Sequence, residues 1–315
     1  MQGLKIKIKA LTYIVLFFTL TSCTSFKITN KLIDTQVTIA QGKLHAQYFG
    51  TSTILISDGY NSIMIDGFFT RQGYWQSFVS RMKSNKEMVR TTLNKSGVTD
   101  VDYLLVGHSH YDHALDSETT AIETGAVLMG SNKTISLSPD AKSKKIDTTK
   151  VIQNGRFQLS FYETEHVKKS LFLQTIESFI NWSTGGSRFG DHAEVYSFFL
   201  EHPQSNILIV PSSGFSDEIT LRDKADIVFL SIGLLGNQSD QYIMNYWQRA
   251  VVDTCAELVI PIHWDNFSKP LVEPIEPAPI LIDDLNRTMQ VLNKLAMHSN
   301  CTNSPVRILF PPAAK

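Results

Sequence analysis

The chain has 315 residues, of which 43% are hydrophobic and 19% are charged, the composition of an ordinary globular protein. Its formal net charge of -1 offers no basic surface for a phosphate backbone, so nucleic acid is not an expected partner. No linker rich in Pro, Gly or Ser and no internal repeat divides the sequence, which favours one large domain over two small ones.

The N-terminus has the pattern of an export signal. Residues 1–9 carry three lysines and no acidic residue, and residues 10–20 form an apolar run. This run is too short to cross a bilayer as a helix, which takes about 20 residues. It ends at Leu20-Thr21-Ser22-Cys23, which resembles the lipobox of bacterial lipoproteins, where the chain is cut before the cysteine and the cysteine is acylated.

This resemblance predicts a signal peptide over 1–22, a lipidated Cys23, a tether over 23–40 and a functional domain over 41–315. Acyl chains would hold the protein at a membrane surface. Thr24 after the cysteine, in place of Asp, favours the outer membrane, so the expected location is the bacterial cell envelope, facing the periplasm. An ordinary signal peptide and an uncleaved membrane anchor remain alternatives.

The first half of the domain combines strands with helices. Residues 44–69 contain β-type runs broken at Gly50 and at the hairpin signal Asp58-Gly59. The spacing of Trp75, Phe78, Val79 and Met82 predicts a helix over 73–96. The other elements expected here are a buried strand at 101–107, a helix at 115–124 and strands at 126–130 and 157–165.

The second half alternates strands with helices, a pattern that favours an α/β protein with sheet in the middle. Strands are expected at 194–202, 206–212, 225–233, 257–265 and 306–310, and helices at 239–256 and 280–297. The segment 170–192 is expected either to pack as an amphipathic helix or to line a pocket with Phe172, Phe179, Ile180 and Trp182; His192 in the same segment is a candidate substrate contact. The remaining cysteines, Cys255 and Cys301, either form a disulfide or are separate buried residues.

The segment VGHSHYDHALD (106–116) places four metal-ligand side chains within six positions. His108 and His110 share one face of an extended segment, so both imidazoles can reach one ion. Asp112 and His113 follow in a turn, because a strand would send adjacent side chains apart. Three imidazoles and one carboxylate suit Zn²⁺, Fe or Mn²⁺, and so dense a pattern seldom arises by chance. The sequence therefore predicts a metal site at the end of strand 101–107.

The segment resembles the His-x-His-x-Asp-His signature of the metallo-β-lactamase superfamily. The likeness extends over about 44–310: residues 48–69 resemble the opening hairpin of the family, with Asp66 at its end. DIVFLSIG (226–233) and LVIPIHWDNF (258–267) resemble late strands of the branch that contains lactonases and phosphodiester-cleaving enzymes. The resemblance implies a four-layer αββα sandwich, with the metals in a cleft at one edge.

The resemblance also implies two groups of three ligands, and a cofactor of one or two zinc ions, with Fe or Mn possible. Each group combines residues of the signature with a histidine from a distant strand end. The first group is His108, His110 and His166, and the second is Asp112, His113 and His263.

One position departs from the family pattern. The family places an aspartate that bridges both metals in a short glycine-containing turn, and the corresponding turn here is 211–214, with Ser212 at the bridging position. A neutral hydroxyl is a weak ligand beside a carboxylate, so two nearby dications would repel with less compensation. We therefore expect weaker or partial occupancy of one position. Asp191, Asp217 and Glu218 are acidic residues that can substitute, and the sequence does not select among them.

The chemistry implied is hydrolysis. A bound metal lowers the pKa of water and supplies hydroxide, which attacks an ester, lactone, amide or phosphodiester of a small-molecule or lipid-like substrate. Asp112 is expected to orient the water and pass a proton to the leaving group, and His263 to stabilise the developing charge. There is no serine nucleophile elbow, phosphate-binding loop or dinucleotide fingerprint.

Two alternatives stand beside the hydrolase. Ser212 suggests a protein that binds metal but has lost turnover, and the same fold also hosts iron-dependent oxygenases. Neither the identity of the substrate nor the oligomeric state follows from the sequence.

Overall fold

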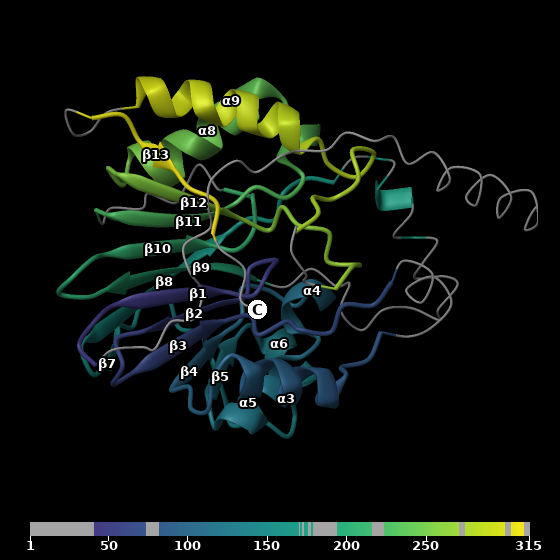
Figure 1. The fold of residues 1–315 in the computed structure, drawn as a ribbon, viewed down its shortest axis with the longest axis vertical. Coiled ribbons are helices and arrows are strands. Elements are labelled where there is room, and N and C mark those ends of the chain that lie inside the picture. The colour runs from purple at the N-terminus through teal and green to yellow at the C-terminus, as the bar shows by residue number, and fades with distance from the viewer. Residues whose placement is uncertain are drawn as a thin grey trace, which may run out of the picture.

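The computed structural model describes residues 41–73, 82–169, 194–215, 224–270, 275–299 and 304–311, together with five residues between 170 and 193. Within these ranges the chain forms two mixed β-sheets that pack face to face, with helices on the outer face of each (Figure 1).

The first sheet has six strands in the order in which they occur in the chain. The first three strands form antiparallel hairpins and the later ones pair in parallel. The hairpin turn predicted at Asp58 is confirmed, because its carboxylate accepts hydrogen bonds from the backbone N–H groups of Tyr60 and Asn61. The strands are β1 (His45–Tyr48), β2 (Ile54–Ser57), β3 (Ser62–Ile65), β4 (Tyr103–Leu105), β5 (Val127–Gly130) and β6 (Ser143–Lys145).

The second sheet has seven strands in the order β13-β12-β11-β10-β9-β8-β7. The strands from β10 to β13 pair in parallel and those from β7 to β10 in antiparallel fashion. The strands are β7 (Ile152–Asn154), β8 (Phe157–Thr164), β9 (Val195–Glu201), β10 (Ile207–Val210), β11 (Ile227–Ser231), β12 (Leu258–Ile262) and β13 (Arg307–Ile308).

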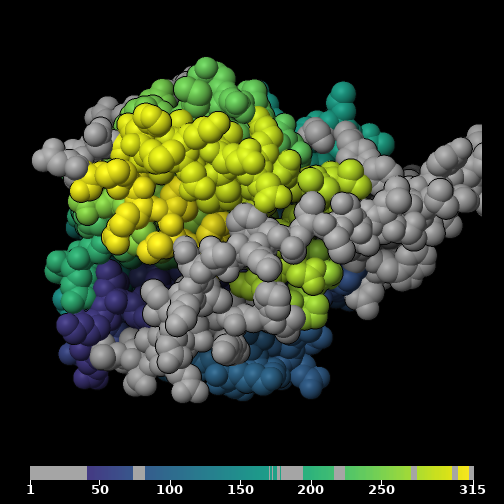
Figure 2. Space-filling model, turned by 45° about the horizontal axis from the view of Figure 1, so that its top comes forward, coloured from purple at the N-terminus to yellow at the C-terminus, as the bar shows by residue number. Residues whose placement is uncertain are grey.

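Helices cover both outer faces (Figure 1). Against the first sheet lie α3 (Lys86–Lys95), α5 (Ser117–Thr124) and α6 (Asn132–Leu137), and against the second lie α8 (Asp240–Trp247) and α9 (Leu285–His298). A π-helical turn, Gln248–Val252, extends α8, and the short helix α4 (Tyr111–Ala114) lies at the edge where both sheets end. Figure 2 shows α9 and its surroundings, in yellow and green, as one continuous outer surface above the N-terminal strands.

The core has three layers because most strands bury side chains on both faces. In β2, Ile54 and Ile56 point between the sheets, whereas Leu55 points under the helices of the first sheet. In β11, Phe229 points between the sheets and Leu230 points under α8 and α9. This alternation of two apolar faces explains why the strands read as continuous hydrophobic runs in the sequence.

The predicted helix over 73–96 is wrong in its described N-terminal part. Residues 82–85 are not helical, and α3 begins after Asn85, whose side chain accepts a hydrogen bond from the Met88 N–H. The preceding residue, Ser84, donates to the buried carboxylate of Asp116 and is thereby drawn out of the helix. The side chain of Asp284 likewise accepts a hydrogen bond from the Arg287 N–H. Helix α9 therefore begins at Leu285, five residues later than predicted.

Several predictions concern residues outside the described ranges, namely 1–40 with Cys23, the segment around Trp75 and most of 170–193. The predicted domain boundaries therefore stay predictions. Cys255 is disulfide-bonded, and Cys23 and Cys301 both lie outside the described residues. Among the described residues, no helix is both long and apolar enough to cross a bilayer.

Candidate metal centre

Three strand ends and one short helix bring the predicted ligands together. The segment after β4 carries His108 and His110 and continues into α4, the segment after β8 carries His166, and β12 is followed directly by His263. Since β4 belongs to one sheet and β8 and β12 to the other, the ligands meet at the shared edge of the sandwich. Two groups of three side chains with mutually close ligand atoms result: His108, His110 and His166, and Asp112, His113 and His263.

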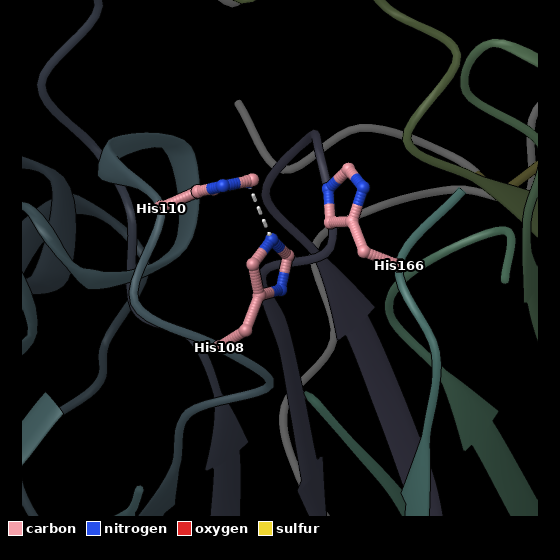
Figure 3. A group of neighbouring side chains, drawn as sticks. All are labelled: His108, His110 and His166. Carbon is pink, nitrogen blue, oxygen red and sulfur yellow. Dashed lines mark hydrogen bonds between the residues drawn. The ribbon is translucent and has the colours of Figure 1, made fainter. Parts of the chain in front are cut away.

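The first group consists of three converging imidazoles (Figure 3). His108 Nε2 lies 3.0 Å from His110 Nδ1. The ring centroid of His166 lies 5.0 Å from that of His108 and 4.6 Å from that of His110. Two nitrogens bound at about 2.0–2.1 Å to one tetrahedral zinc would be about 3.3 Å apart, so this spacing is close to that of a metal-bound pair.

The first group presents neutral imidazoles. Burial lowers the pKa of His108 well below its ordinary value, lowers that of His110 to about 2 and lowers that of His166 to about 4. The Nδ1 of His166 donates to the Val167 carbonyl at 2.7 Å, which leaves Nε2 of this ring with its lone pair available. At neutral pH, three unprotonated nitrogens therefore lie within reach of one ion.

The second group joins a carboxylate to two imidazoles. His263 Nε2 lies 3.2 Å from His113 Nε2 and 3.1 Å from Asp112 Oδ2. Burial alone would raise the pKa of Asp112, but the nearby His113 and His263 lower it strongly, so this carboxylate stays ionised. Two nitrogens and one oxygen anion are a suitable donor set for zinc or iron.

A buried carboxylate fixes the second group from behind. Asp66 Oδ2 lies 2.8 Å from His113 Nδ1 and accepts a 2.5 Å hydrogen bond from Ser52 Oγ, while Asp66 Oδ1 accepts from the Gly107 N–H. Burial lowers the pKa of His113, but the charges of Asp66 and Asp112 outweigh this and raise it. The bond to Nδ1 turns Nε2 of His113 towards the other ligands, as in the carboxylate–histidine pairs of metal sites.

The turn after β10 passes between the two segments that carry the first group. A side chain at Gly107 would meet Pro211 at 2.9 Å, and one at Gly214 would come within 2.6 Å of the carbonyl carbon of His166. Ser212, between these contacts, is 4% exposed, and its Oγ has no hydrogen-bond partner among the described residues. The neighbouring Ser213 is held by its bond to the Gly233 carbonyl. A buried, unpartnered oxygen at this place is consistent with the predicted bridging position.

The structure thus brings the predicted ligand residues together in two groups that could each hold a metal ion. The acidic substitutes Asp191, Asp217 and Glu218, and also His192, lie outside the described residues. Two supporting residues are not predicted from the sequence: its pattern marks Asp66 only as the end of a hairpin and does not single out Ser52. The apolar strand that ends in a lone aspartate, SIMID, was the available signal for Asp66.

No protein-family model matches the chain. The chain is similar to two proteins named UPF0173 metal-dependent hydrolase. One, from Christiangramia forsetii, is 23% identical over 227 residues, which are 70% of this chain and 84% of that protein. The other, from Flavobacterium johnsoniae, is 28% identical over 189 residues, 59% of this chain and 71% of that protein.

Among solved structures, the metallo hydrolase Igni18 from Ignicoccus hospitalis is similar in fold, with a TM-score of 0.51 and 14% identity over 85% of this chain and 96% of that one. The similarity in fold to Igni18, together with the two facing sheets, confirms the predicted αββα sandwich. The names of the sequence relatives agree with the predicted class of enzyme. The chain has an αββα fold similar to that of a solved metallo hydrolase, and its sequence relatives are named metal-dependent hydrolases.

Proposed function

We propose that this chain is a metal-dependent hydrolase of the bacterial cell envelope that cleaves an ester, lactone, amide or phosphodiester. The observation that carries the proposal is the pair of adjacent ligand groups, three histidines in one and an aspartate with two histidines in the other, at one edge of the sandwich. Divalent ions held there would supply Lewis acidity for hydrolysis.

The residues of the chain have distinct tasks in this reaction. His108, His110 and His166 stay neutral because burial lowers the pKa of each, and they would hold one ion. Asp112 stays ionised, so its carboxylate is available to orient a water molecule and to carry a proton to the leaving group. His263, which is part of the second group, faces the same space and is placed to stabilise negative charge on the substrate.

Aromatic side chains beside the second group favour a substrate with an apolar part. Phe267 is half-buried, its ring centroid lies 5.9 Å from that of His263 at an interplanar angle of 90°, and it also contacts Tyr111 at 5.9 Å. These two aromatic side chains suit contact with an acyl chain or another lipid-like group better than contact with a strongly hydrated group. This supports a small-molecule or lipid-like substrate.

The envelope location rests on the N-terminal sequence alone. A basic start, an apolar run and a cysteine after small residues together favour lipidation at Cys23 and a membrane-attached enzyme that faces the periplasm. Mass spectrometry of the N-terminal peptide from membranes tests this proposal. An acylated Cys23 at the N-terminus is expected, and an unmodified cysteine within a longer peptide contradicts it.

Metal analysis of the purified chain without residues 1–22, combined with turnover of chromogenic esters, lactones and phosphodiesters, tests the hydrolase. We expect bound zinc and turnover that is lost in His108→Ala, whereas His298→Ala, an exposed histidine of α9, retains both. Unchanged turnover in His108→Ala would show that the site is assigned wrongly. No bound metal under metal-replete conditions would contradict a metallohydrolase, and one iron per chain would favour an oxygenase.

A further inference from the structure

We propose that Asp265, two residues after the ligand His263, is a positioning residue for the second ligand group. The inference rests on the proposed metal centre and does not depend on which substrate is cleaved. Asp265 is 1% exposed and forms an ion pair with Arg71 at 2.7 Å. Both side chains are almost completely buried, so the pair is a fixed part of the structure and not a solvated surface contact.

The carboxylate of Asp265 holds the loop between β1 and β2. Its Oδ1 accepts hydrogen bonds from the Thr51 N–H at 2.7 Å and from the Tyr48 hydroxyl at 3.1 Å. The Thr51 carbonyl in turn accepts from the His263 N–H at 2.6 Å, and it shares the single proton of the Tyr48 hydroxyl, 3.0 Å away, with Asp265. The backbone of the metal ligand is therefore tied to a loop that Asp265 itself fixes.

The backbone in this network has an unfavourable conformation that needs such support. Thr51 has a φ of 52° and His263 a φ of 60°, both in the left-handed region that residues other than glycine seldom adopt. Conformations of this kind persist where the surrounding structure imposes them. The bond from the His263 N–H to the Thr51 carbonyl and the bond from the Thr51 N–H to Asp265 supply that constraint, and they fix the backbone from which the His263 imidazole extends.

The ion pair also connects His263 with the opposite side of the site. Gly50 leaves room for Arg71, because a Cβ at this glycine would lie 1.9 Å from Arg71 Nη2. Thr70, next to Arg71, is held through its N–H and its hydroxyl by the buried carboxylate of Asp116. Asp116 closes the same VGHSHYDHALD segment that supplies Asp112 and His113. The network therefore sets the distance between the two halves of the second ligand group.

Zinc titration of the metal-free protein against a chromophoric chelator tests the inference. In Asp265→Asn we expect the affinity of the second zinc equivalent to fall at least about tenfold, and that of the first to stay the same. The matched control is Asp58→Asn, which alters a buried carboxylate with a histidine neighbour, His202, in the turn at the opposite end of β2 and β3. This control is expected to leave both zinc affinities unchanged even where it lowers stability.

Variants of the partners separate positioning from general destabilisation. Arg71→Lys keeps the charge and is expected to retain most of the affinity of the second equivalent, whereas Arg71→Met loses it. In the metal-free protein, amide hydrogen exchange at His263 is expected to be faster in Asp265→Asn than in the Asp58→Asn control. Equal exchange and equal zinc affinity in these two variants would overturn the inference.

If Asp265→Asn does not fold, Tyr48→Phe is the test variant, since it removes the single hydroxyl proton that Asp265 and Thr51 share, without a change of charge. Its second zinc equivalent is expected to bind about threefold or more weakly, and an unchanged affinity would refute the role of the network. Failure of the unmodified protein to bind any second equivalent would instead contradict the proposed two-metal centre.

Discussion

Ser212 lies in the turn that passes between the ligand segments, and its buried hydroxyl has no hydrogen-bond partner among the described residues. We propose that a carboxylate at this place would reduce the repulsion between two dications. The first group does not depend on it, because its three imidazoles are complete and neutral. The second group has only one carboxylate, Asp112, among its ligands. We therefore expect the two positions to bind metal with different affinities.

Ser212→Asp is expected to tighten the binding of the weaker zinc equivalent at least roughly tenfold, because a new negative charge lies close to the ion. The metal-free variant is expected to be less stable than the unmodified protein, since the same carboxylate is then buried without a partner. Calorimetric zinc titration measures the affinity. Ser212→Asn, similar in shape but neutral, is the control and is expected not to tighten binding. Equal affinities in both variants would mean that residue 212 does not face the metals.

At the scale of elements, the sequence predicted strands more successfully than helix starts. The strands after which the ligands lie are apolar runs of a few residues, which their periodicity reveals directly. The start of α3 could not be predicted in this way, because it depends on Asp116, a residue about thirty positions away that binds Ser84. Likewise, His113 and His263 are 150 residues apart, and only the pairing of the strands brings their Nε2 atoms to 3.2 Å. The proximity of these two histidines was predicted from the family resemblance and not from composition.

A buried carboxyl group in the loop before α9 makes the stability of the fold depend on pH. Asp283, just before α9, is 4% exposed and accepts hydrogen bonds from the N–H groups of Leu234 and Gly236. Burial raises its pKa to about 6 from the ordinary value of 3.8. Between these values the folded state holds a proton that the unfolded state has lost, so stability falls as the pH rises from about 4 to about 6.

Asp283→Asn is expected to remove this pH-dependent contribution, which is on the order of 2–3 kcal/mol across that interval. Urea unfolding of both proteins in steps from pH 4 to pH 7 measures the free energy of unfolding at each pH. Relative to the unmodified protein, the variant should gain free energy of unfolding as the pH rises, because only the unmodified protein must ionise the buried carboxyl group. A difference that stays constant with pH would contradict the raised pKa.

At the scale of the whole molecule, the metal ligands bridge the two sheets. His108 and His110 follow β4 of the first sheet, whereas His166 follows β8 of the second; the second group likewise pairs α4 with the end of β12. A bound ion would therefore add a further connection between two layers that the apolar core and polar contacts, such as the bond from the His263 N–H to the Thr51 carbonyl, already join. Ligands that bind only the folded state stabilise it by mass action, by about 2.7 kcal/mol at a free concentration of 100 times the dissociation constant.

Removal of metal is accordingly expected to lower the melting temperature of the whole sandwich by about 5–10 °C, since each kcal/mol corresponds to about 2–4 °C for a domain of this size. Differential scanning calorimetry with and without a chelator measures the effect, and readdition of zinc should reverse it. His108→Ala, which breaks the first group, should melt near the temperature of the metal-free protein and respond little to zinc. The exposed His298→Ala control should respond like the unmodified protein. A melting temperature that a chelator leaves unchanged, in protein shown to have lost its metal, would mean that the ions do not connect the sheets energetically.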